Sequence, residues 1–425
     1  KQKTAYEIGV RLVGSEMCIR DRCWNLKNPS MTLMSLGSSL RSDVNSCETT
    51  SSEFTVSTLT NPIEIATFEV KKNDWTNTRV NSTSFNGNLE EDQVLFAIDR
   101  FALTANNISY CLAGDTLGYW QFFPTTDGYG RVPAMGYANV AASNHSEIKV
   151  GDRFWGFYPM SNYLIVQAGN VSASGFSDAV PYRQSLAPIY SRFDNVNANP
   201  LYEEAREDQD LLIRGLFLTS WLVDDFMFDN DYFGANTYVI TCASSKTSIA
   251  LAFTAQQRGE KRRIGMTSEK NVEFCQSLGC YDEVITYDQG RTLDNNDSIM
   301  IVDMAGNFSA MQDLHEHFAD NVKYSCSVGA THQANQKDFN VGDMNSFPGA
   351  TPTFFFAPTQ AQKRTEEWGP GEVQKRIGMS LKEFQIYSDQ WMSIHRGKGF
   401  DEIANTFSKV VEDGISPSQG LILSV

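Results

Sequence analysis

The chain has 425 residues, of which 41% are hydrophobic and 12% aromatic, and its formal net charge is −16 at pH 7. This length and this apolar content suit a globular protein with two domains of ordinary size. The acidic charge argues against a nucleic-acid partner, because phosphate backbones are also negative, and no apolar run is long enough to span a membrane. We therefore expect a soluble protein that binds neither nucleic acid nor a membrane.

The first 22 residues do not resemble part of a fold. Lys1–Ile8 and Leu12–Arg22 resemble the translated ends of sequencing-library adapters, with Gly9–Arg11 in the place of a sample index. We expect residues 1–22 to be an artefact and leave them out of the fold. Residues 23–60 are rich in Ser and Thr without a regular pattern, which indicates a disordered lead.

Seven of the eight cysteines follow residue 22, and none of these seven forms a CxxC pair. The odd number and the irregular spacing favour reduced thiols over a disulfide framework. Reduced thiols are typical of cytoplasmic proteins, so we expect a cytoplasmic location. Targeting to an organelle stays open, because the sequence does not fix the natural start of the chain.

Short alternating strands are predicted from Glu64 to about Gln167, where FEVKK, VLFAIDRFALT, KVGDRFWGFY and NYLIVQAG are separated by turns. We assign residues 61–200 to a β-rich domain. From Leu201 the period changes, and Leu211–Phe228 has the pattern of a buried helix.

Strands then alternate with helices, which predicts a parallel sheet with ligands at the carboxyl ends of its strands. We assign residues 201–335 to this nucleotide-binding domain and residues 336–425 to a C-terminal segment that returns to the first domain. The predicted strands are Tyr238–Cys242, Arg263–Met266, Glu283–Thr286, Ser298–Met304, Val322–Val328 and Gly420–Val425. The predicted helices are Thr247–Arg258, Glu269–Leu278, Phe308–Phe318 and Phe400–Glu412.

Three segments resemble the medium-chain dehydrogenase/reductase superfamily: GYANVAASNHSEIKVGDRFWGFYP (136–159), SLGCYDEVITYD (277–288) and VDMAGN (302–307). Four others resemble a narrower, uncharacterised group, domain of unknown function 2855: FALTANNISY (101–110), GYWQFFP (118–124), LFLTSWLVDDF (216–226) and FFFAPTQAQKRTEEWGP (354–370). The resemblance spans roughly residues 65–425. It implies an α/β protein, with a GroES-like β-rich catalytic domain plus a Rossmann-like doubly wound parallel-sheet domain. Relatives often dimerise through an edge strand, so a homodimer is compatible with the resemblance.

The same resemblance predicts no metal. Zinc-dependent relatives have a cysteine where this chain has Ala105–Asn107, and Gly-His-Glu where it has Met135–Tyr137. Zinc takes thiolate, imidazole or carboxylate ligands, and neither stretch offers one. A metal bound by residues far apart in the sequence remains the alternative.

The turn after the first strand of the αβ units, residues 242–248, contains no glycine. Relatives have glycines there, which let the backbone approach a pyrophosphate. Hydroxyls and a cation replace them at the predicted helix N-terminus: Ser244, Ser245, Lys246, Thr247 and Ser248. Because a helix N-terminus favours anions, we predict a phosphate-binding loop. In the alternative interpretation Ser244 or Ser245 only caps the helix and Lys246 points to solvent.

The end of the second strand selects the cofactor in relatives, where an acidic residue holds the ribose of NAD. This chain has Thr267 and Ser268 at that place, with Lys270 close behind. Hydroxyls and a cation suit a 2′-phosphate, so we predict NADPH. The alternative is a capping box that begins at Ser268.

Zinc-free reductases of this fold need a hydride from nicotinamide and a group that donates a proton or stabilises an oxyanion. The candidates on the segment that faces the cleft in relatives are Asn106, Asn107, Tyr110 and Tyr119. Lys363 and Arg364 either face the cofactor or a substrate carboxylate, or belong to a solvated helix face.

These residues predict a zinc-independent, NADPH-dependent reductase of a small α,β-unsaturated carbonyl, quinone or related apolar substrate. The alternative is a non-catalytic dehydrogenase-like binding or scaffold protein that has lost cofactor binding.

Overall fold

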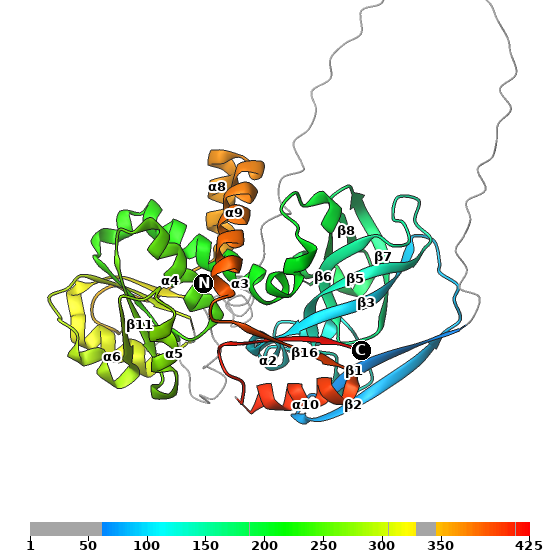
Figure 1. Ribbon diagram of the computed structural model, residues 1–425, viewed down its shortest axis with the longest axis horizontal. Coiled ribbons are helices and arrows are strands. Elements are labelled where there is room, and N and C mark those ends of the chain that lie inside the picture. The colour runs from blue at the N-terminus through cyan, green and yellow to red at the C-terminus, as the bar shows by residue number, and fades with distance from the viewer. Residues whose placement is uncertain (1–61, 187, 305, 329–345, 413) are drawn as a thin grey trace, which may run out of the picture.

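The computed structural model describes residues 62–186, 188–304, 306–328, 346–412 and 414–425. The predicted adapter-derived residues 1–22 and the predicted disordered lead, residues 23–60, lie outside the described residues. Figure 1 shows two lobes side by side, one built mainly of strands and the other of a sheet covered by helices.

The strand-rich lobe contains an eight-stranded sheet in the order β16-β17-β3-β5-β6-β9-β8-β7. Strand β7 also pairs with β3, which closes six of these strands into a barrel. The eight strands are β3 (Gln93–Leu103), β5 (Pro133–Ser143), β6 (Arg153–Pro159), β7 (Tyr163–Ser172), β8 (Gly175–Asp178), β9 (Arg192–Asn195), β16 (Ser393–Lys398) and β17 (Gln419–Ser424). Alternating aromatic residues fill the interior, where the ring of Phe96 lies 5.0 Å from Phe193 and 5.9 Å from Phe176.

Smaller elements cover this barrel. A three-stranded sheet has the order β2-β1-β4. Its strands are β1 (Ile63–Lys71), β2 (Asp74–Phe85) and β4 (Tyr129–Gly130), and the helices of this lobe are α2 (Ala105–Leu112) and α10 (Phe400–Val411). The C-terminal strand β17 pairs with β3 through Leu421 and Leu103, so the end of the chain lies within the strand-rich lobe.

The second lobe holds a six-stranded parallel sheet in the order β12-β11-β10-β13-β14-β15. The strands are β10 (Thr237–Ile240), β11 (Arg262–Thr267), β12 (Glu283–Thr286), β13 (Ile299–Asp303), β14 (Val322–Ser327) and β15 (Thr353–Phe354). The helices are α4 (Lys246–Arg258), α5 (Val272–Ser277) and α6 (Phe308–Phe318). All five residues of β13 are buried, as its continuous apolar run predicts for a covered parallel strand. The predicted Rossmann-like sheet is therefore confirmed.

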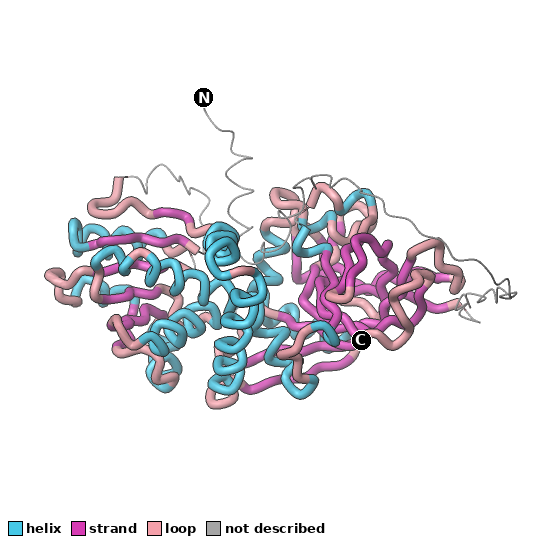
Figure 2. Tube along the Cα trace, turned by 90° about the horizontal axis from the view of Figure 1, so that it is seen from above, coloured by secondary structure: helices cyan, strands magenta, loops and turns pink. Residues whose placement is uncertain are grey.

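Helices lie between the two groups of strands, as the view from above shows (Figure 2). They are α3 (Glu207–Asp229), α8 (Ala357–Trp368) and α9 (Pro370–Ser388). The predicted buried helix 211–228 is thus longer by about one turn at its start, where the residues are acidic and an apolar pattern could not find them.

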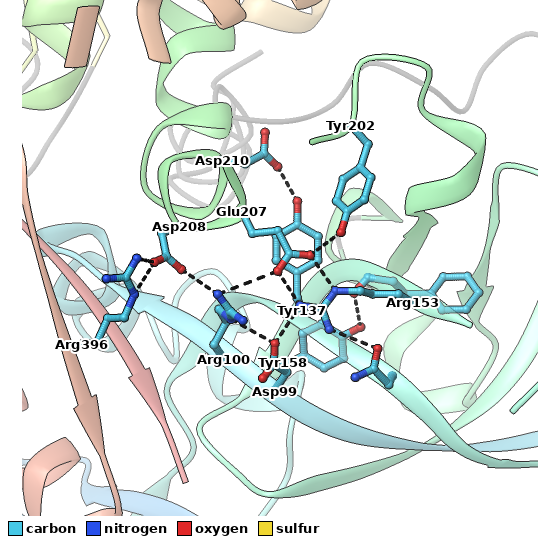
Figure 3. A network of polar contacts seen from close by, with 12 residues as sticks. Asp99, Arg100, Tyr137, Arg153, Tyr158, Tyr202, Glu207, Asp208, Asp210 and Arg396 are labelled. Carbon is cyan, nitrogen blue, oxygen red and sulfur yellow. Dashed lines mark hydrogen bonds and ion pairs between the residues drawn. The ribbon is translucent and has the colours of Figure 1, made fainter. Parts of the chain in front are cut away.

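The acidic first turn of α3 is fixed to the strand-rich lobe by three arginines (Figure 3). Arg153 of β6 donates from Nε to Glu207 Oε1 at 2.6 Å. Asp208 accepts from Arg100 of β3 at 3.1 Å and from Arg396 of β16 at 2.7 Å. Carboxylates at a helix N-terminus are stabilised by the helix dipole, and the arginines compensate their burial. This network sets where α3 begins and how it leaves the barrel.

Candidate functional site

The carboxyl ends of β10 and β11 meet the N-terminus of α4, at the place where this sheet type binds ligands. Strand order reverses here, because β10 pairs with both β11 and β13. Cys242, in the turn after β10, has φ of 51°, a left-handed conformation that favours glycine. The turn therefore keeps a glycine-like backbone although it contains no glycine.

Two tyrosines hold this turn from the side of β12. The hydroxyl of Tyr287 accepts the amide of Cys242 at 3.1 Å, and the hydroxyl of Tyr281 donates to Ala243 O at 2.9 Å. Sequence reasoning missed both residues. Their only signal was the position of Tyr287 directly after a predicted strand.

Two of the predicted phosphate-binding serines serve the fold. Ser245 caps α4, and its Oγ accepts the amide of Ser248 at 3.1 Å. Ser248 is buried, and its hydroxyl donates to Thr241 O at 2.9 Å. For Ser245 the structure thus has the capping contact of the alternative interpretation.

Three backbone amides around the turn point away from these contacts. Among the residues that the structure describes, the amides of Ser244, Lys246 and Thr247 donate no hydrogen bond. The first amides of a helix have no partner inside it; Lys246 and Thr247 are the first two residues of α4, which has 13 residues, and Ser244 precedes its N-cap. This end of α4 therefore offers donors and a positive dipole end to an anion.

The side chain of Lys246 lies elsewhere. Its Nζ donates to Gln419 O at 2.8 Å and to Pro417 O at 3.2 Å. Gln419 is the first residue of β17, and Pro417 lies two residues before it. The side chain is half-buried, and burial lowers the pKa of Lys246 from 10.5 to about 8. The ammonium group of Lys246 thus does not point to solvent. It contacts the carbonyl oxygens of Pro417 and Gln419 and does not lie beside the three amides.

The end of β11 brings a second set of predicted residues to the same turn. Ser244 Oγ accepts from Thr267 Oγ1 at 3.4 Å and from Asn271 Nδ2 at 3.1 Å. Asn271 also donates to Ser268 Oγ at 3.2 Å. Lys270 is exposed beside them. Asn271 joins the two loops, a contact that the sequence could not reveal because it crosses between strands.

Three of the four catalytic candidates line one small cavity between α2 and α3. The cavity has a volume of about 40 Å³, which suits a water-sized group. Its lining includes Asn106, Asn107 and Tyr110 from α2 and Leu211, Leu212, Gly215 and Leu216 from α3. Asn106 Nδ2 donates to the Tyr110 hydroxyl at 3.4 Å, and both residues belong to the polar part of the lining, together with Thr104 and Asn107.

Two of the four catalytic candidates, Asn107 and Tyr119, have structural contacts. Asn107 completes a capping box with Thr104 and donates from Nδ2 to Pro133 O at 2.7 Å. Tyr119 is buried with its ring 4.5 Å from Tyr110, and its hydroxyl donates to Tyr190 at 3.3 Å. Tyr119 therefore packs against the ring of Tyr110.

Lys363 is exposed on α8, in line with a solvated helix face, whereas neither expectation holds for Arg364. Arg364 is buried and donates from Nε to Asp225 Oδ2 at 2.6 Å, and Lys363 pairs with Asp229. Both carboxylates belong to α3, so these cations join α8 to α3. A buried carboxylate such as Asp225 requires a cation, and helix packing brings Arg364 to it.

Some features are absent from the part of the chain that the structure describes. There, no group of three or more His, Cys, Asp or Glu side chains could hold a metal ion. Within the same residues, no helix has the length and apolarity needed to cross a bilayer.

A family model described as protein of unknown function (DUF2855) matches residues 101–416. A search of curated proteins found no match. Solved structures share the fold at low identity. CurA from Vibrio vulnificus is 12% identical with a TM-score of 0.54, over 85% of this chain and 99% of that chain.

Two further structures have a TM-score of 0.51. A putative NADPH:quinone reductase from Bacillus thuringiensis is 14% identical, over 85% of this chain and 99% of that one. A thermostable alcohol dehydrogenase from Pyrobaculum aerophilum is 9% identical, over 85% of this chain and 100% of that one. These likenesses confirm the expected fold, a β-rich lobe combined with a Rossmann-like parallel sheet.

Proposed function

Because the chain belongs to the DUF2855 family and has the medium-chain dehydrogenase/reductase fold, we propose that it is an NADPH-dependent, zinc-independent reductase. The observation that carries the proposal is that, within the described residues, the amides of Ser244, Lys246 and Thr247 at the N-terminus of α4 donate no hydrogen bond. Buried or half-buried donors of this kind favour a bound anion, and the pyrophosphate of a dinucleotide supplies one. The name of the Bacillus thuringiensis relative, which mentions NADPH, is in line with this choice.

The cofactor preference rests on the group at the end of β11. The hydroxyl of Thr267 and the side-chain amide of Asn271 contact Ser244, Asn271 also contacts Ser268, and Lys270, the residue before Asn271, is exposed. Such donors suit a phosphate on the adenosine ribose. We therefore propose NADPH over NADH.

The substrate would lie at the cavity between α2 and α3. When bound, NADPH supplies a hydride. Tyr110 would donate a hydrogen bond to the substrate, and then a proton to the substrate oxygen or carbon that becomes basic when the hydride arrives. Asn106 would orient the Tyr110 hydroxyl. The apolar lining from Leu211, Leu212 and Leu216 suits a small enone or quinone.

A non-catalytic dehydrogenase-like protein is the second candidate. Two observations favour it. The cavity of about 40 Å³ is smaller than a nicotinamide ring, and the turn amides of Cys242 and Ala243 already have partners. For the chain to act as a reductase, the lobes would have to move apart before the nicotinamide could enter the cavity.

Titration of the full chain with NADPH and with NADH, followed by nicotinamide fluorescence, tests the proposal. We expect NADPH to bind at least about tenfold more tightly than NADH, the size of one charge-assisted contact. Lys270→Met should remove most of this preference, whereas Lys375→Met, at an exposed lysine of α9, should not change it. Failure of both dinucleotides to bind would favour the non-catalytic candidate.

A further inference from the structure

The side chain of Lys246 connects the two lobes at the candidate site. Its backbone begins α4 in the α/β lobe, and its ammonium group contacts the carbonyl oxygens of Pro417 and Gln419 at 3.2 and 2.8 Å. Within the described residues, no carboxylate lies within 4.0 Å of Nζ, so the two carbonyl dipoles are its polar partners. Burying an ammonium group costs free energy, and these two contacts offset part of that cost.

The contacted segment leads directly to the proposed substrate cavity. Gln419 begins β17, in which Leu421 pairs with Leu103 of β3. The next residue of that chain, Thr104, caps α2 and lines the cavity. The position of β17 therefore helps to set the position of α2, which carries Asn106 and Tyr110.

A second contact reaches the cavity from the same point. A Cβ atom at Gly420 would lie 2.4 Å from Leu212 Cδ1, so β17 begins in close contact with α3. Leu212 lines the cavity from the side opposite α2. The segment that Lys246 holds thus contacts both walls of the cavity within three residues.

We infer that Lys246 is a positioning residue, whose side chain fixes residues 417–419 and the start of β17 against the cofactor-binding end of α4. This inference rests on the proposed function, because it concerns how one ligand contacts both lobes. The backbone amide of Lys246 would bind the cofactor, and its side chain would hold the other lobe at the right distance. Two of the three Nζ donors are used by the carbonyl oxygens of Pro417 and Gln419.

Two ligands of different reach distinguish this role from phosphate binding. The nucleotide 2′,5′-ADP carries only the adenosine and phosphates that the α/β lobe would hold, whereas NADPH also extends to the cavity. In Lys246→Met, we expect the Kd for NADPH to rise about tenfold, the size of a lost charged hydrogen bond, and the Kd for 2′,5′-ADP to change less than about twofold. The increase in NADPH fluorescence on binding should also be smaller in Lys246→Met than in the wild type. Lys246→Arg, which keeps donors for two carbonyls, should restore most of the NADPH affinity, and Lys323→Met, at an exposed lysine of β14, should match the wild type.

Other outcomes overturn the inference in recognisable ways. Equal losses for both ligands would mean that Lys246 binds a phosphate directly, and unchanged binding of both would remove any role. Failure of the wild type to bind either ligand would overturn the proposed function and this inference together.

Hydrogen exchange of the wild type decides the question if Lys246→Met does not fold. We expect NADPH to slow amide exchange over residues 417–424 and 104–110, and 2′,5′-ADP to leave these two segments unchanged. No added protection of residues 417–424 by NADPH would overturn the inference.

Discussion

Arg153 and Glu207 form a buried ion pair that joins the barrel to the first turn of α3, with Nε and Oε1 separated by 2.6 Å. Glu207 is 1% exposed, and it also accepts a hydrogen bond from the Tyr202 hydroxyl at 2.6 Å. Because α3 also supplies one wall of the candidate cavity, the pair links the stability of the fold to the shape of the site.

Removal of the Glu207 charge should destabilise the protein. Glu207→Gln removes the carboxylate that accepts two hydrogen bonds from Arg153 and leaves Asp99 as the remaining carboxylate of that guanidinium, which should cost about 1–3 kcal/mol. The measurement is the free energy of unfolding in urea. Glu316→Gln removes an exposed carboxylate paired with Arg291 and should cost less than about 1 kcal/mol. Equal effects of the two substitutions would show that the Arg153–Glu207 pair is no more important than a surface pair.

Tyr110→Phe should slow the proposed reaction without weakening cofactor binding. The hydroxyl is the polar group of the cavity that can donate a proton, and loss of such a group lowers kcat by about 10²-fold. Turnover of enones or quinones with NADPH gives kcat, and fluorescence titration gives the Kd for NADPH. Tyr182→Phe changes a tyrosine that is 48% exposed and serves as the control. A variant with wild-type kcat would exclude Tyr110 as the proton donor.

Ser268→Asp should reverse the cofactor preference. A carboxylate beside Asn271 would repel a 2′-phosphate, and like charges at such a distance raise the Kd for NADPH by about tenfold or more. NADH lacks that phosphate, so its Kd should change little. Ser277→Asp, at an exposed serine that ends α5, controls for added negative charge. If NADPH and NADH are affected alike, the end of β11 does not bind the 2′-phosphate.

Lys246 should make the stability of the protein depend on alkaline pH. Burial lowers the pKa of Lys246 from 10.5 to about 8, so between these values the unfolded chain binds more protons than the folded one. Stability therefore rises with pH across this window through this group. The free energy of unfolding of wild type minus that of Lys246→Met should increase from pH 8 to pH 10. A constant difference would mean that the ammonium group is as well solvated in the folded protein as in the unfolded chain.

Local patterns in the sequence were sufficient for the secondary structure of the α/β lobe. Predicted strand Ser298–Met304 corresponds to β13, and predicted helix Thr247–Arg258 corresponds to α4 within one residue. The predicted helix Glu269–Leu278 is shorter, because a tighter turn over Glu269–Asn271 precedes α5. Helix α2 escaped prediction, since its eight residues include two adjacent asparagines and its start depends on a capping box.

The sequence by itself determined the fold class, because the pattern of apolar residues that predicts buried strands and helices involves residues that are neighbours along the chain. It also determined which loops lie at the ends of β10 and β11. Only the tertiary structure decided what each polar side chain contacts there. The ammonium group of Lys246 meets carbonyl oxygens 171 and 173 residues away, and Asn271 reaches Ser244 across two strands. Such partners depend on how the lobes pack. Packing brings together residues that are far apart in the sequence, and a periodic pattern of apolar residues does not predict such contacts.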